Sequence, residues 1–208
     1  EKTGTQKMNR QPLIIAAETA MNTWDPDPDH ARQVCRLALD IYDQLAPLHD
    51  LDKYSAGGVP PRRILETAAL MHDIGWSGSG SRGHHKKSHA MIMDMSLPGV
   101  SDTDHKKIAL VARYHRKRHP DPSRHYFFAE MNPDDQRQVQ WLAGILRVAD
   151  GLDRAHTADV KRIACGIVND TITLEIQCPS GFAVAVYGAN RKKALLEEIS
   201  GCTVIITP

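Results

Sequence analysis

The sequence has few of the features that mark a membrane protein, a secreted protein or a nucleic-acid binder. No apolar run approaches the roughly 20 residues that a membrane-spanning helix requires. The first ten residues, EKTGTQKMNR, are polar and lack the apolar core of a signal peptide. The net charge is +1 and only 5% of the residues are aromatic, so a global positive field and a stacking surface for bases are both missing. We therefore expect a cytoplasmic protein with no membrane partner and no specific nucleic-acid partner.

Cysteine is also scarce. The four cysteines, Cys35, Cys165, Cys178 and Cys202, form no CxxC pair, and their spacing matches no zinc ribbon. We expect reduced, mostly buried thiols. The remaining composition, with 41% hydrophobic and 25% charged residues in a chain of 208, is that of a globular protein with one sizeable core and a small annex.

Histidine, by contrast, is abundant. The chain has eleven, and four of them lie with one aspartate in the stretch LMHDIGWSGSGSRGHHKKSH, residues 70–89. Histidine is the commonest protein ligand for metal ions. The stretch is either a polar surface loop or half of a metal site.

Apolar residues recur at helical spacing along the first three quarters of the chain. Helices are expected from Asp29 through Leu45, from about Arg62 to Asp73, over 88–96, over 102–117 with Asp102 or Thr103 as the cap, and over 134–156. Residues 119–133 are expected to be irregular.

After about Thr157 the apolar period changes from helical to alternating. Residues 160–178 alternate around Asn169-Asp170, which indicates a hairpin. FAVAVYG, residues 182–188, is expected to continue as a strand, followed by a helix over 190–200 and a final strand over 201–208. The predicted fold is therefore mainly α: a helical domain over 1–157 and a small α+β subdomain over 158–208, in the order β-β-β-α-β.

Four residues are expected to point inward from three different helices. His30 opens the first helix on the face of Val34, His72 and Asp73 end the second, and Asp150 lies on the core side of the last. Buried carboxylates cost several kcal/mol unless a cation compensates them. A divalent ion held by two imidazoles and two carboxylates provides that compensation. Such mixed donors suit Mn, Fe, Co, Ni or Zn, and Mg less well.

The order H…HD…D resembles the signature of the HD phosphohydrolase superfamily. The segments HARQVCRLALDIYDQL, ILETAALMHDIGW, RGHHKKSH, LPGVS, ARYHRKRHP and LAGILRVADGLDRAH are similar to the C-terminal region of the exopolyphosphatase/guanosine-pentaphosphate phosphatase (Ppx/GppA) family. This resemblance covers about Asp29 to the C-terminus and implies an HD-type helical bundle followed by a small mixed sheet. Full-length members carry two actin-like domains ahead of this region, to which polyphosphate hydrolysis is attributed. We expect those domains to be absent here, so that exopolyphosphatase activity does not carry over.

The resemblance also implies a second ion. Six-ligand members of the superfamily place histidines between the HD pair and the last aspartate, which suggests His89 and His115 as ligands, with His84 and His85 as alternatives. Asp153 is expected to orient a ligand from behind. The expected substrate-binding residues are cations and imidazoles around these positions: Arg82, His84, His85, Lys86, Arg116, Lys117 and Arg154.

These features together predict a metal-dependent phosphohydrolase with one or two divalent ions. His72 and Asp73 would be catalytic, and a metal-bound hydroxide would attack the phosphorus of a phosphoester or phosphoanhydride. The substrate would be small and nucleotide-like or polyphosphate-like, and the sequence is compatible with a homodimer. The alternative is a non-catalytic regulatory module that binds a nucleotide or polyphosphate.

Overall fold

The computed structural model describes residues 12–54, 58–77 and 82–208, and these are mainly helical, as the sequence predicts. The helical part comprises α1 (Pro12–Trp24), α2 (Pro28–His49), a 3₁₀ turn η1 (Leu51–Tyr54), α3 (Pro61–Met71), α4 (His84–Asp94), α5 (Asp102–Arg113), α6 (Tyr126–Ala129) and α7 (Pro133–Leu152). The C-terminal part comprises β1 (Arg162–Val168), β2 (Thr171–Gln177), α8 (Phe182–Asn190), α9 (Ala194–Ser200) and β3 (Thr203–Thr207). No helix in the described ranges is long and apolar enough to cross a membrane.

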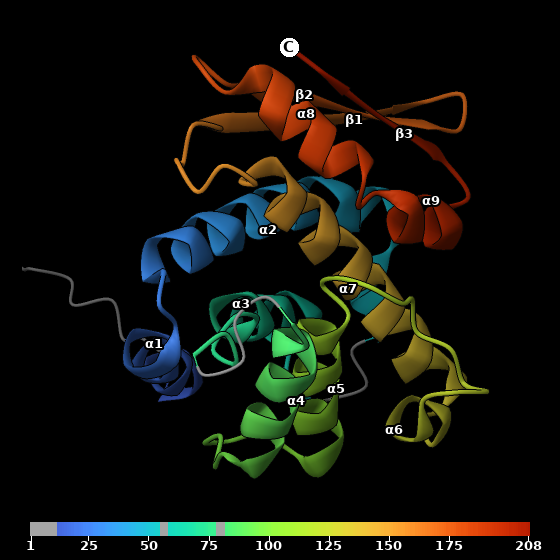
Figure 1. Ribbon diagram of the computed structural model, residues 1–208. Coiled ribbons are helices and arrows are strands. Elements are labelled where there is room, and N and C mark those ends of the chain that lie inside the picture. The colour runs from blue at the N-terminus through green and yellow to red at the C-terminus, as the bar shows by residue number, and fades with distance from the viewer. Residues whose placement is uncertain (1–11, 55–57, 78–81) are drawn as a thin grey trace, which may run out of the picture.

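The long helices α2 and α7 lie between the C-terminal part, which holds the sheet, α8 and α9, and the helices α1, α3, α4 and α5 (Figure 1). On one side, β1 packs against α2, while α8 and α9 pack against α7. On the other side, α3 contacts both long helices, and α5 contacts α3 and α7. The core is continuous through these layers, because the buried apolar residues of the helices and of the sheet form one cluster. The division into two domains after Thr157 stays a prediction.

The sheet has three strands in the order β1-β2-β3. β1 and β2 form the expected antiparallel hairpin, with Val168 opposite Thr171 and with Asn169 and Asp170 at positive φ in the turn. β3 pairs with β2 in parallel, Ile172 lying opposite Val204. Ile172, Leu174 and Ile176 of β2 point into the core, so one face of the sheet is buried.

The predicted strand at residues 182–188 is wrong: these residues begin α8, and the C-terminal order is β-β-α-α-β. A short apolar run fits a strand and a buried helix equally well by periodicity alone. The small residues Ala185, Gly188 and Ala189 are the buried ones of α8, and their spacing is helical. They allow α8 to cross α7 closely, since a Cβ on Gly151 would lie 2.6 Å from the carbonyl oxygen of Gly188.

This crossing predicts a strong effect of a single methyl group. A Cβ on Gly188 would overlap the backbone of Gly151, and backbone cannot move aside as a flexible side chain can. We expect Gly188→Ala to lower the free energy of unfolding by about 2–3 kcal/mol, measured by urea denaturation. Gly166→Ala in β1 is the matched control, because nothing lies within 4 Å of its Cβ. Equal stability of the two variants would contradict the close crossing.

Several predicted boundaries also shift. Helix α1 was not predicted, and α4 starts at His84, four residues before the expected Ser88. Helix α5 is capped by Ser101, whose side chain accepts a hydrogen bond from the Asp104 amide, and not by Asp102 or Thr103. The region expected to be irregular contains the short helix α6, and α7 ends at Leu152. The four cysteines are unpaired, two buried and two half-buried.

Candidate metal centre

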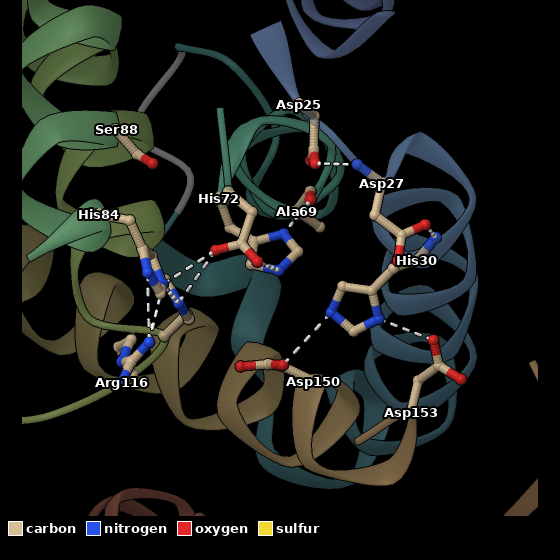
Figure 2. Close-up of polar contacts among 12 residues, drawn as sticks. Asp25, Asp27, His30, Ala69, His72, His84, Ser88, Arg116, Asp150 and Asp153 are labelled. Atoms are coloured by element: carbon tan, nitrogen blue, oxygen red, sulfur yellow. Dashed lines mark hydrogen bonds and ion pairs between the residues drawn. The ribbon is translucent and has the colours of Figure 1, made fainter. Parts of the chain in front are cut away.

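His30 is placed by the sequence DPDPDH at the start of α2. Asp27 caps the helix, because its side chain accepts a hydrogen bond from the His30 amide, and Pro28 occupies the first turn. The imidazole of His30 is 3% exposed and its Nδ1 donates to Asp153 Oδ2 at 2.7 Å. A neutral imidazole with Nδ1–H so engaged presents the lone pair of Nε2 on its other side. That nitrogen lies 3.5 Å from Asp150 Oδ1 (Figure 2).

His72 and His115 are oriented in the same way by backbone carbonyls. Each follows the end of a helix, where carbonyl groups lack helical partners. His72 Nδ1 donates to the Ala69 carbonyl, and His115 Nδ1 donates to the Ala112 carbonyl, both at 2.7 Å. Both rings are buried. Each therefore presents an Nε2 lone pair away from its helix.

The structure brings His30, His72 and Asp150 together in one group and Asp73, His84 and His115 in a second. Within each group the ligand atoms lie within 4.8 Å of one another. His72 Nε2 is 3.6 Å from Asp73 Oδ2, so the two groups adjoin. They could hold two ions side by side, with the HD pair between them.

The second group has the geometry of ligands around one ion. Asp73 Oδ1 lies 3.2 Å from His84 Nε2 and 3.5 Å from His115 Nε2, and the two nitrogens are 3.3 Å apart. Three donors bound at about 2.1 Å with tetrahedral angles lie about 3.4 Å apart. Asp73 Oδ1 and His72 Nε2 are also buried without a hydrogen-bond partner in the described part of the chain. The residues therefore fit a divalent transition metal.

The electrostatics of the centre keep its carboxylates ionised. Burial would raise the pKa of Asp73, but the charge of His72 and the contact with His84 outweigh it, so that this pKa lies well below its usual value. The pKa of Asp150 is also held well below its usual value, because Lys192 and His30 outweigh the effect of burial. For His30, the lowering by burial is overcome by Asp150 and Asp153, and the pKa rises to about 10. The two carboxylates therefore favour the protonated form of the His30 imidazole at neutral pH.

His89, predicted as a ligand of the second ion, lies in neither group, and His84 stands in its place. Because α4 starts at His84, His89 falls more than one turn later, where its ring packs against Phe127. Its Nε2 is buried without a hydrogen-bond partner among the described residues. Burial first, and then the charge of Arg113, lower the pKa of His89 to about 4.

His89 should therefore make the protein sensitive to acid. The pKa of His89 is lower in the folded protein than its ordinary value of 6.5 in the unfolded chain. The contribution of His89 to the free energy of unfolding is therefore fully present above pH 6.5 and is lost as the pH falls toward 4. At pH 5 the loss amounts to about 1–2 kcal/mol. We expect His89→Leu to reduce the fall in unfolding free energy between pH 7 and pH 5 by that amount, in urea titrations of metal-free protein. The variant should bind as much metal as the wild type. If it binds one ion fewer, His89 is a ligand after all.

Several residues of the site were not singled out from the sequence. Asp25, between α1 and α2, is 8% exposed; its Oδ1 accepts a hydrogen bond from the Asp27 amide, and its Oδ2 is buried without a partner in the described ranges. Lys192, beyond α8, is ion-paired with Asp150. His156 is exposed, but its ring stacks on that of His30, with the ring centroids 3.7 Å apart. Neither Asp25 nor Lys192 shares a sequence pattern with the ligands.

The predicted substrate-binding cations divide between two adjoining cavities and the surface. A polar cavity of about 390 Å³ is lined by every member of the two candidate ligand groups except His72, and also by Arg116, Lys117 and Arg154. A second cavity of about 650 Å³ is lined by His85, Lys86, Arg116 and Lys117, among others. Arg82 is exposed and lines neither. Trp76 also lines the ligand cavity, with its ring centroid 4.6 Å from that of His84.

The sequence that forms this site matches the model of a protein family. Residues 15–198 match the model of the family described as Ppx/GppA phosphatase, domain III. The match spans all the candidate ligands from His30 to Asp150, and also Lys192. It relates the chain to phosphatases. The chain belongs to the Ppx/GppA phosphatase domain III family.

Proposed function

We propose that this protein is an HD-type, metal-dependent phosphohydrolase that cleaves a phosphoester or phosphoanhydride bond. His30, His72 and Asp150 would hold one divalent ion, and Asp73, His84 and His115 would hold a second. When bound, such ions supply an activated water and neutralise the charge that develops on phosphoryl oxygens. Mn, Fe, Co, Ni and Zn suit the nitrogen and oxygen donors better than Mg does.

The observation that carries the proposal is the convergence of Asp73 Oδ1, His84 Nε2 and His115 Nε2 at 3.2–3.5 Å. Direct hydrogen bonding explains this poorly, because Asp73 Oδ1 accepts no hydrogen bond from the described residues. The tautomers of His72 and His115, fixed by the Ala69 and Ala112 carbonyls, leave lone pairs and not N–H groups facing the site. Lone pairs that face one another require a cation between them.

The protein's own residues would bind and orient the phosphoryl group. Arg116 and Lys117 line the cavity on the side of the second ligand group, and Arg154, Arg191 and Lys192 line it beyond Asp150. Guanidinium groups grip phosphoryl oxygens in pairs, whereas lysine acts as a point charge. Trp76 and the stacked His156 also line the cavity. A small substrate with an accessible terminal phosphate fits this lining.

The test is metal analysis followed by assays on a substrate panel. Protein purified without chelator should contain up to two transition-metal ions per chain, and His30→Gln should lose one of them. Reconstituted protein should hydrolyse a phosphoester or phosphoanhydride bond in at least one nucleotide, cyclic nucleotide, polyphosphate or aryl phosphate. Metal-replete protein that is inactive on the whole panel would contradict the phosphohydrolase. Tight nucleotide binding without turnover would favour the regulatory module.

A further inference from the structure

The larger cavity beside the metal centre, here called the basic pocket, lies between the start of α4 and the segment that follows α5. It is about 650 Å³ in volume, and none of its lining residues is acidic. Six cations line it: Lys86, Arg113, Arg116, Lys117, Arg118 and Arg124. Among these six, considering the described part of the chain, only Arg124 is ion-paired with a carboxylate, that of Asp121. A concave surface with so many unneutralised cations attracts an anion of high charge.

Two nearly buried polar groups in the lining also lack partners. Tyr114 is 2% exposed and His85 is 8% exposed. The Tyr114 hydroxyl and His85 Nδ1 are buried, and neither hydrogen-bonds to any residue that the structure describes. A buried polar group without a hydrogen bond costs about 1–3 kcal/mol. Donors of this kind beside guanidinium groups match a phosphoryl group, which offers several strong acceptors.

Arg116 links the basic pocket to the metal centre, because it lines both cavities. Its Nη1 lies 3.0 Å from His84 Nε2 and 3.3 Å from His84 Nδ1 (Figure 2). His84 Nε2 is also the atom that would bind the second ion. Because the distances from Nη1 to the two ring nitrogens are nearly equal, Nη1 lies over the face of the imidazole, and its positive charge there repels a divalent ion bound at Nε2. Arg116 and the second ion therefore compete for His84.

We propose that the basic pocket binds a phosphoryl group, and that Arg116 pairs with this group and leaves His84 free for the second ion. Phosphate binding and second-ion binding then strengthen each other, since coupling between two sites is reciprocal. The coupling rests on the proposed metal centre, whereas the phosphoryl site does not. Orthophosphate and a second phosphoryl group on the substrate share the required chemistry.

The first experiment tests the phosphoryl site in metal-free protein, by calorimetric titration with orthophosphate at fixed low ionic strength. Arg113 lines the basic pocket but not the ligand cavity, so Arg113→Gln should weaken binding at least about tenfold. Arg137→Gln, an exposed change of the same kind on α7, should leave binding unchanged. Equal affinity of wild type and Arg113→Gln would overturn the site. Titration of metal-loaded protein with pyrophosphate identifies the source of the bound phosphoryl group. If pyrophosphate binds more tightly than orthophosphate and Arg113→Gln abolishes the difference, the group is carried by the substrate. If the two bind equally, the ligand is orthophosphate.

The second experiment tests the coupling, by counting free Mn²⁺ by electron paramagnetic resonance with and without saturating orthophosphate. Phosphate should tighten the second ion about tenfold in the wild type, within the usual range of such couplings. In Arg116→Gln the second ion should bind as tightly without phosphate as with it. In Arg113→Gln phosphate should have no effect on the ion. An unchanged second-ion affinity in the wild type overturns the coupling. Phosphate binding with no second ion in any variant refutes the metal centre and the coupling, and leaves the phosphoryl site standing.

Discussion

Asp73→Asn is expected to remove one bound ion and to lower phosphohydrolase activity on the order of a thousandfold. Asp73 Oδ1 lies within 3.5 Å of both His84 Nε2 and His115 Nε2, and Oδ2 lies 3.6 Å from His72 Nε2. This carboxylate therefore contacts members of both candidate ligand groups. Asparagine keeps its shape but loses its charge, and a neutral amide binds a divalent ion far more weakly than a carboxylate does.

The measurements for Asp73→Asn are metal content per chain, turnover on the best substrate, and thermal unfolding. Asp94→Asn is the matched control, since Asp94 is exposed at the end of α4 and outside both ligand groups. The control should keep wild-type metal content and turnover. If Asp73→Asn is folded, loses no ion and retains a tenth or more of the activity, Asp73 is not a ligand and the proposed centre is wrong.

Arg147→Met is expected to lower the free energy of unfolding by about 3 kcal/mol. Arg147 is 6% exposed, and its guanidinium donates to the carbonyls of Tyr114 and Lys117, with a longer contact to that of Lys192. Burial lowers its pKa to about 10, an effect that Asp150 partly offsets, so the group is still charged at neutral pH. Methionine fills a similar volume but donates nothing, and it leaves these carbonyls without their donor.

Urea denaturation of Arg147→Met should be compared with that of Arg137→Met, an exposed position on the same helix. The control should change stability by less than about 0.5 kcal/mol. Because Arg147 holds the segment that carries His115, Arg116 and Lys117, orthophosphate binding by metal-free Arg147→Met should also weaken. A loss of stability below about 1 kcal/mol would mean that other groups hold this segment.

The predicted residues that the structure brings together lie where local rules decide the side-chain direction. The DPDPDH cap fixes the start of α2 and with it His30, and the apolar period of α7 places Asp150 on the core side. The position of His72 follows from the end of α3 before Gly75. These three residues meet because each helix face is determined within a few turns of sequence, whereas Asp73, expected in the same group, lies with His84 and His115.

Other features depend on contacts between distant segments, which no local pattern shows. Gly83, at φ +82°, precedes the first residue of α4, and this start places His84 and not His89 beside Asp73. Helix α8 forms because small residues meet α7, although its apolar composition fits a strand equally well. Lys192 reaches Asp150 from 42 positions along the chain. Asp25 is positioned by the turn between α1 and α2, and α1 itself was not predicted.

The close crossing of α7 and α8 couples the position of the C-terminal segment to that of the candidate ligand Asp150. Gly151 and Gly188 meet backbone to backbone, so the contact contains no side chain that could absorb a displacement. Asp150 precedes one of these glycines, and Lys192 follows the other by four residues. A small shift of α8 would therefore also displace the Asp150 carboxylate. The C-terminal segment cannot move on α7 without changing the pairing of Asp150 with Lys192, and with it the electrostatics of the candidate centre.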